Sequence, residues 1–147
     1  MSGEAPGVLV LCTGNSCRSQ MAEAFLRRDG EGRLQAFSAG TEPAAEIHPL
    51  ARRVMAEEGL DLAGQYAKEY GAYLDKAPIR TLITVCGGAA ESCPAVWPGV
   101  EERLHWPIED PAAFVGGEEE TLARFRQVRD ELKRRVREWL AAFDAAG

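Results

Sequence analysis

The chain has 147 residues, of which 46% are hydrophobic and 27% charged, so it is long enough for one domain with a continuous apolar core, and we expect a single domain over residues 1–147. Its formal net charge of -6 argues against a general nucleic-acid-binding surface, which neutralises phosphates with Lys and Arg. The apolar run at residues 7–11 is too short to span a bilayer and follows no basic segment typical of a secretory signal, so we expect a soluble cytoplasmic protein.

The first half of the chain alternates strand and helix patterns. Residues 8–12 are apolar and β-branched, which predicts a buried strand, and the pattern of residues 18–28 predicts a helix. A second strand is predicted at residues 34–38, closed by a turn at Ala39 and Gly40. A second helix is expected to follow Pro49 and to stop at Gly59.

The second half is predicted to add two strands and one long helix. Residues 63–76 indicate a loop with a short helix, residues 79–86 a strand, and residues 103–106 a shorter strand. Apolar residues then recur at steps of three and four between residues 118 and 143, which predicts an amphipathic helix: Leu122, Phe125, Val128, Leu132, Val136, Trp139 and Phe143. The fold class is therefore α/β, with a small, mainly parallel sheet of about four strands flanked by helices.

The segment from Cys12 to Ser19 carries the strongest chemical signal. Five residues separate Cys12 from Arg18, between a predicted strand and a predicted helix. The backbone N–H groups of such a loop and of the helix N-terminus can hold a tetrahedral oxyanion, and an Arg guanidinium can bind two of its oxygens. The residues expected to bind the oxyanion are Thr13, Gly14, Asn15, Ser16, Cys17 and Arg18.

Cys12 stands at the edge of this loop, where it can act as a nucleophile. The donors that hold an anion also stabilise a thiolate, so we expect the pKa of Cys12 to lie well below that of a free thiol. Ser19 is predicted to donate a hydroxyl hydrogen bond to the thiolate or to a leaving sulfur. The structural alternative is a buried strand residue at Cys12 followed by an ordinary turn at Gly14 and Asn15.

Residues 8–23, with the sequence VLVLCTGNSCRSQMAE, resemble the low-molecular-weight protein tyrosine phosphatase superfamily. Further matching features follow along nearly the whole chain: residues 38–40, Cys86, Cys93, residues 105–106, and residues 110–111. Within the superfamily the chain is most similar to the thioredoxin-coupled arsenate reductases. Both branches share the first motif, so the two later cysteines distinguish them.

Cys86 and Cys93 are seven positions apart in a segment of small residues. In a continuous helix their Cα atoms would lie roughly 10 Å apart, beyond the ~7 Å limit for a disulfide, so pairing them requires this segment to rearrange. Two buried structural cysteines are the alternative. Zinc binding is disfavoured because neither cysteine pair of the chain has the short spacing of a structural zinc site, and we expect no metal and no cofactor.

The resemblance to arsenate reductases implies a relay of three thiols. Cys12 would attack arsenate, with Asp110 protonating the departing oxygen, and Cys86 would then attack Cys12 and release arsenite. Cys93 would attack Cys86, and thioredoxin would reduce the resulting disulfide. Phosphate or sulfate would compete with arsenate. We expect the protein to act as a monomer, without nucleic acid or membrane.

The same resemblance leaves alternatives at several positions. A low-molecular-weight tyrosine phosphatase is the second candidate, although Ala112 and Ala113 follow Asp110-Pro111 where these phosphatases usually carry an aromatic residue, and a non-enzymatic sensor of arsenic or redox state is a third. Asp110-Pro111 alone is also typical of a turn, and Cys17 is either an oxidation-sensitive partner of Cys12 or structural. Trp97 is either a packing residue or part of a thioredoxin-docking face, while Trp106, His48 and His105 are expected to be structural or surface residues.

Some relatives place potassium near side chains matching Asn15, Glu23 and Ser38, together with a carboxylate. Here the fourth position is Lys68, whose ammonium would replace the ion.

Overall fold

The computed structural model describes residues 5–62, 64–73, 78–85 and 99–146. Within these ranges four parallel strands form one sheet in the order β2-β1-β3-β4. The strands are β1 (Gly7–Cys12), β2 (Gln35–Gly40), β3 (Ile79–Thr84) and β4 (Glu102–His105). The predicted α/β class and the predicted number of strands are confirmed.

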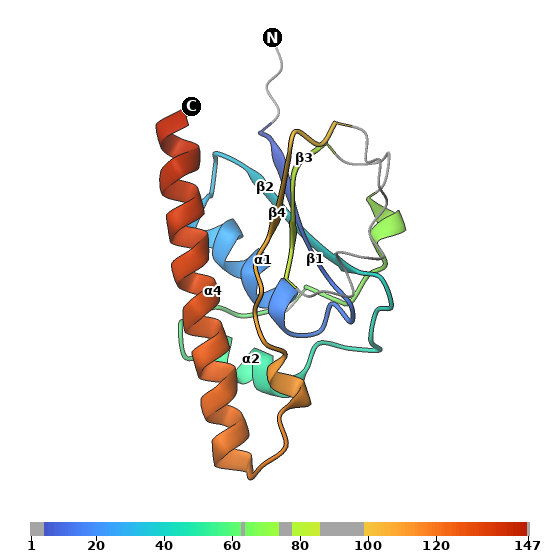
Figure 1. The fold of residues 1–147 in the computed structure, drawn as a ribbon, viewed down its shortest axis with the longest axis vertical. Coiled ribbons are helices and arrows are strands. Elements are labelled where there is room, and N and C mark those ends of the chain that lie inside the picture. The colour runs from blue at the N-terminus through green and yellow to red at the C-terminus, as the bar shows by residue number, and fades with distance from the viewer. Residues whose placement is uncertain (1–4, 63, 74–77, 86–98, 147) are drawn as a thin grey trace.

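Three α-helices and two short 3₁₀ helices complete the described chain. They are α1 (Arg18–Asp29), α2 (Pro49–Ala56), η1 (Tyr70–Ala72), η2 (Pro111–Ala113) and α4 (Glu118–Ala146). In Figure 1, α1 and α4 lie side by side along the sheet, while α2 lies near the end of the sheet to which β1 runs. None of the helices in the described part of the chain is long and apolar enough to cross a membrane.

The central strand β1 is buried along its whole length because both of its faces are covered. Val8 and Val10 belong to the main apolar core, which the helices share. Leu9 and Leu11 point to the opposite face, where a smaller cluster contains Ile79 and Leu82 and packs against η1. A strand covered on both faces has a continuous apolar sequence, and this is the pattern from which β1 was correctly predicted.

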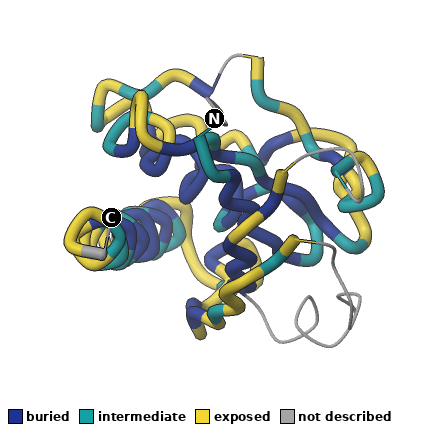
Figure 2. The backbone as a smooth tube through the Cα atoms, turned by 90° about the horizontal axis from the view of Figure 1, so that it is seen from above, coloured by how far each residue is buried: buried dark blue, intermediate teal, exposed yellow. Residues whose placement is uncertain are grey.

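Helix α4 buries one stripe and exposes the other side to solvent, as the colours along it show in Figure 2. Its first turn is acidic, which favours the positive end of the helix dipole. Trp139 and Phe143, which were predicted to belong to the apolar stripe, are only partly buried. The buried stripe consists of Leu122, Phe125, Val128, Leu132, Val136 and Leu140.

The carboxyl end of α2 is fixed to α4 by charged side chains. Arg129 is buried and donates to the carbonyl of Val54 (3.0 Å) and to the carboxylate of Glu57 (2.8 Å). Arg126 donates to the same carboxylate at 2.7 Å, and these hydrogen bonds lower the pKa of Glu57 to about 2. Helix α2 is therefore held in a defined position on α4.

Two predicted strand ends differ from the structure. Ala39 and Gly40 do not form a closing turn, because β2 continues and pairs Gly40 with Cys12 at the end of β1. Gly40 also donates its backbone N–H to the carbonyl oxygen of Lys68 at 2.7 Å, so the end of β2 pairs with this distant segment and does not turn back. Strand β3 ends at Thr84, two residues before the predicted end, and Cys86 lies outside the described residues.

Candidate active site

The oxyanion loop, residues 12–19, connects the carboxyl end of β1 to the start of α1, as predicted. Cys12 is the last residue of β1 and only 2% exposed, and Arg18 is the first residue of α1. This position at the carboxyl ends of parallel strands is where ligands bind in open α/β sheets. The structure therefore brings the nucleophile candidate and the guanidinium to the same end of the sheet.

A strap of residues 41–48 holds the carbonyl groups of the oxyanion loop. Four backbone N–H groups of the strap donate to loop carbonyls at 2.8–3.2 Å, in the pairs Thr41 to Cys12, Glu42 to Thr13, Ala44 to Gly14 and His48 to Ser16. The described peptide bonds are all trans, so each N–H that follows a held carbonyl points away from the strap. The N–H of Asn15, for example, donates to Cys12 Sγ at 3.1 Å. The strap thereby orients the amides of an anion-binding nest.

Asn15 sits in the left-handed region with φ of 50°, a conformation that Asn tolerates better than most residues. The orientation of its amide is fixed, because the backbone N–H of Lys68 donates to Oδ1 (2.9 Å) and can only be a donor. Gln20 Nε2 donates to the same oxygen at 2.9 Å. Asn15 Nδ2 consequently donates to Ser19 Oγ (2.8 Å) and to Ser38 Oγ (3.0 Å).

The hydrogen bond between Ser19 and Cys12 can stabilise a thiolate. Ser19 Oγ and Cys12 Sγ are 2.8 Å apart, and either atom has the chemistry to donate. Because Asn15 Nδ2 already donates to Ser19 Oγ, the serine hydroxyl is free to donate its own hydrogen to the sulfur. When Cys12 is ionised its sulfur has no hydrogen, so Ser19 is then the donor and stabilises the thiolate.

The pKa of Cys12 differs from the sequence-based prediction. Burial is the largest influence and raises the pKa of the Cys12 thiol above its ordinary value, whereas the loop donors were expected to lower it. The hydrogen bonds from Ser19 and Asn15 and the charge of Arg18 act in the expected direction but are smaller than the effect of burial. The thiolate of Cys12 consequently depends on these donors.

Removing the Ser19 hydroxyl tests this dependence. Ser19→Ala is expected to raise the pKa of Cys12 further and to slow thiolate-dependent reactions at neutral pH by roughly 10- to 100-fold, the value of one hydrogen bond to a charged group. The measurement is the pH dependence of kcat/KM for p-nitrophenyl phosphate, whose acidic limb should move to higher pH. Ser38→Ala is the matched control, since Ser38 bonds to Asn15 but not to the sulfur. An unchanged limb in Ser19→Ala would contradict the assigned direction.

Arg18 links the loop to the segments that follow β3 and β4. Its Nη1 donates to the carbonyl of Ile108 at 2.9 Å and more weakly to that of Val85 at 3.4 Å. Its Nη2 lies 3.8 Å from Asp110 Oδ2, and the two side chains are 11% and 42% exposed. The structure thus brings the predicted acid beside the predicted oxyanion-binding guanidinium.

The two carboxylate oxygens of Asp110 have different neighbours. Its Oδ1 accepts the backbone N–H of Ala112 at 3.0 Å, which caps η2 and is the local structure expected of an Asp-Pro pair. Its Oδ2 faces Arg18. The turn therefore aims one carboxylate oxygen at the mouth of the oxyanion loop.

Of the other residues singled out in the sequence, Cys17, His105 and Trp106 lie within the described part of the chain. Cys17 is buried beside Ser16, and burial raises the pKa of its thiol to about 12. His105 bonds to Thr84 at 2.8 Å and Trp106 is buried in the core. Three residues for which the sequence suggested redox or docking roles lie outside the described residues: Cys86, Cys93 and Trp97.

Three of the four side chains proposed to lie near potassium in relatives are joined by hydrogen bonds, from Asn15 to Ser38 and from Ser38 to Glu23. Ser38 Oγ donates to Glu23, and Arg27 also bonds to this carboxylate. Lys68 is largely buried and donates its ammonium to Tyr66 O at 2.6 Å. The negative charge of Glu23 stabilises this ammonium, although burial is the larger influence and lowers the pKa of Lys68.

Gln20 is a supporting residue that the sequence analysis missed. It is fully buried and donates to the backbone oxygen of Asn15 (3.0 Å) as well as to the Asn15 side chain. Its own Oε1 accepts from Gln65 at 2.6 Å. An amide on the side of α1 that faces the core was the available signal, because buried polar side chains need partners. The strap left no such signal, since its contacts with the loop use backbone atoms.

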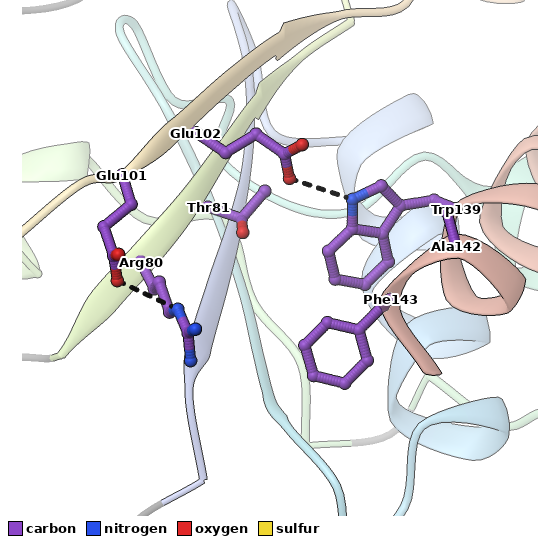
Figure 3. Close-up of a pocket in the computed structure, with 7 residues that line it drawn as sticks. All are labelled: Arg80, Thr81, Glu101, Glu102, Trp139, Ala142 and Phe143. Atoms are coloured by element: carbon purple, nitrogen blue, oxygen red, sulfur yellow. Dashed lines mark hydrogen bonds and ion pairs between the residues drawn. The ribbon is translucent and has the colours of Figure 1, made fainter. Parts of the chain in front are cut away.

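A groove of about 420 Å³ lies at the opposite end of the sheet, between the amino ends of β3 and β4 and the end of α4 (Figure 3). Trp139 and Phe143 stack there with ring centroids 5.1 Å apart, and the Trp139 indole donates to Glu102 at 3.2 Å. Arg80 forms an ion pair with Glu101 at its edge. Among the described residues, no group of three or more His, Cys, Asp or Glu side chains is placed to hold a metal ion.

Comparisons with known proteins agree with this geometry. The model of the family "Low molecular weight phosphotyrosine protein phosphatase" matches residues 7–146. The arsenate reductase of Halalkalibacterium halodurans is 42% identical over 131 residues, covering 88% of this chain and 91% of that protein. A solved arsenate reductase in the phosphate binding state superposes with a TM-score of 0.78 at 32% identity, covering 93% of this chain and 98% of the other. A thioredoxin-dependent arsenate reductase from Corynebacterium glutamicum gives a TM-score of 0.79 at 26% identity over 100% of this chain and 66% of its own.

Proposed function

Because the chain belongs to the low molecular weight phosphotyrosine protein phosphatase family, we propose that it is an arsenate reductase that uses this family's oxyanion loop. The observation that carries the proposal is the environment of Cys12, whose sulfur lies 2.8 Å from Ser19 Oγ and 3.1 Å from the Asn15 N–H. The likeness to the H. halodurans reductase selects arsenate among the possible oxyanions. Reduction of arsenate to arsenite would place the protein in arsenic detoxification.

The first step joins Cys12 to arsenic. The loop amides and Arg18 bind the oxygens of arsenate, and the Cys12 thiolate attacks the arsenic atom. One As–O bond breaks, and Asp110 supplies the proton with which that oxygen leaves as water. The product is a covalent adduct in which arsenic is still pentavalent.

The next steps transfer two electrons from thiols to arsenic. The Cys86 thiolate attacks Cys12 Sγ and forms a disulfide, and the electron pair of the broken S–As bond stays on arsenic, which leaves as arsenite. Cys93 then attacks Cys86, which frees Cys12 and creates a Cys86–Cys93 disulfide. An external dithiol reduces this disulfide.

We propose thioredoxin as that dithiol, acting on a monomeric enzyme in the cytoplasm. Support comes from the C. glutamicum relative, which is described as thioredoxin-dependent. The direct test follows NADPH consumption on addition of arsenate, with thioredoxin and thioredoxin reductase present. No arsenate-dependent consumption by the wild-type protein would refute the proposal.

The relay itself is tested by Cys86→Ser and Cys93→Ser in the same assay. Each variant is expected to lose steady-state arsenate reduction, because either the first or the second disulfide cannot form. Both should still hydrolyse p-nitrophenyl phosphate, because that reaction does not require Cys86 or Cys93, and it serves as the control for an intact site. Wild-type turnover of arsenate by both variants would show that the three-thiol relay is wrong.

A low-molecular-weight tyrosine phosphatase is the second candidate because the family shares the same loop. In that case Cys12 would form a phosphocysteine, and the later cysteines would only protect it. The small residues Ala112 and Ala113 follow Asp110 in η2, where no aromatic ring is present to stack on phosphotyrosine. We therefore propose phosphatase activity only as a slow side reaction, seen with aryl phosphates.

We further propose that the enzyme works without a resident potassium ion. The cluster of Asn15, Glu23 and Ser38 does not fit an added cation, because the Glu23 carboxylate already pairs with Arg27 and interacts with the charge of the Lys68 ammonium, and both would repel a further positive charge. Turnover is expected to change by less than about twofold when potassium chloride replaces choline chloride at equal ionic strength. A large rise with potassium would contradict this role of Lys68.

A further inference from the structure

His48 contacts three parts of the molecule at once. Its backbone N–H donates to the carbonyl of Ser16 in the oxyanion loop at 2.9 Å. Its ring nitrogen Nδ1 accepts the backbone N–H of Leu50 at 3.1 Å and so caps α2. The ring also lies 4.8 Å from that of Phe125 in α4, with a tilt of 37° between the planes.

The contact with Ser16 fixes the peptide that leads into α1. With the Ser16 carbonyl held by His48, the N–H of Cys17 in the same trans peptide points away from the strap. This amide immediately precedes Arg18, the guanidinium of the site. The orientation of one donor of the nest therefore depends on where the backbone of His48 is held.

The His48 side chain anchors this end of the strap together with its buried neighbour Ile47, whereas the first part of the strap has no such anchor. Glu42 and Ala44, which hold two other loop carbonyls, are exposed. His48 is instead fixed by its cap on α2 and by Phe125, which is fully buried in α4. Helix α2 is itself tied to α4 at its other end through Arg129. His48 therefore links the position of the two helices to the oxyanion loop by direct contacts.

We propose that His48 is a positioning residue for oxyanion binding, acting through the Ser16–Cys17 peptide. The proposal deepens the proposed function, since it concerns the same loop, but it applies to any tetrahedral oxyanion held there. Nδ1 must carry no hydrogen in order to accept from Leu50, so the ring acts as the tautomer protonated on Nε2. An Asn side chain offers an equivalent oxygen at an N-cap.

The experiment compares inorganic phosphate binding and thermal unfolding in three variants. His48→Ala removes the cap and the ring, and its phosphate Kd is expected to rise on the order of tenfold, the loss of one well-placed donor to a charged ligand. His48→Asn restores the cap and is expected to recover most of the affinity. Arg52→Gly is the matched control, because it weakens an exposed position of α2 by helix propensity without touching the loop. Its melting temperature should fall while its phosphate Kd stays at the wild-type value.

Several outcomes would overturn the proposal. A wild-type Kd in His48→Ala, together with a lower melting temperature, would reduce His48 to a helix cap. An equal loss of phosphate affinity in Arg52→Gly would show that any loosening of α2 weakens binding, without a specific role for His48. If the wild-type protein binds no phosphate, the proposal is also wrong. If His48→Ala does not fold, His48→Gln replaces it, since Gln is not among the favoured N-caps. Wild-type protein that binds phosphate as expected but reduces no arsenate would refute the proposed function and leave the positioning role intact.

Discussion

Replacing Cys12 by serine is expected to abolish arsenate reduction and aryl phosphate hydrolysis together, each by on the order of 10⁴-fold or more. A serine hydroxyl at this position has the same donors around it but ionises far less readily than a thiol. It also cannot form the disulfide through which the electrons reach arsenic. Both activities depend on one atom, so both should disappear in the same variant.

Phosphate binding should survive the Cys12→Ser change. The strap holds the loop carbonyls through backbone hydrogen bonds that do not involve the Cys12 side chain. Ser19 and Asn15 keep their mutual hydrogen bond at 2.8 Å as well. We expect the phosphate Kd to stay within about threefold of wild type, as judged by titration calorimetry. Residual turnover of both substrates near the wild-type rate would mean that another thiol is the nucleophile.

The elements that position Cys12 were predictable because each has a local cause. Strand β1 is apolar throughout since both of its faces are covered, and α1 begins where the loop ends. Helix α4 repeats its buried residues at helical spacing, and at the end of the stripe Trp139 and Phe143 pack against the core but stay partly exposed, while Leu140 is buried. Local pattern and final burial therefore agree over most of the fold.

Gly40 shows why some local patterns mislead. An Ala-Gly pair is typical of a turn, yet Gly40 is the last residue of β2 and pairs with Cys12. A Cβ atom at this position would lie 2.5 Å from the carbonyl oxygen of Thr13, closer than such atoms approach. The glycine is thus needed for a close contact with the oxyanion loop. That contact joins segments far apart in the sequence, so the pattern around Gly40 could not reveal it.

The pKa of Cys12 could not be predicted for a related reason. The donors that lower it are visible in the motif, because Ser19 and Arg18 are at fixed spacing from Cys12. The burial that raises it comes from the packing of the whole chain around β1. The strap of residues 41–48 was hidden in the same way, since its hydrogen bonds to the loop use backbone atoms that every sequence has.

Asp110→Asn is expected to slow the first chemical step by about 10²- to 10⁴-fold, the usual contribution of a general acid. The substitution suits the test because Asn can still accept the N–H of Ala112 through Oδ1 and cap η2. It loses the proton that the departing oxygen requires. Glu109→Gln is the matched control, since Glu109 is a neighbouring carboxylate that pairs with Arg124 on the surface.

The size of the loss should depend on the leaving group. With p-nitrophenyl phosphate the departing phenolate is stable without a proton, so Asp110→Asn should be slowed less than with phenyl phosphate or arsenate. Phosphate affinity should be unchanged or higher, because the substitution removes a negative charge 3.8 Å from Arg18. A fall in kcat with a constant or lower KM would therefore identify Asp110 as the acid. Equal losses for both aryl phosphates, with weaker phosphate binding, would instead indicate that Asp110 only supports the position of Arg18.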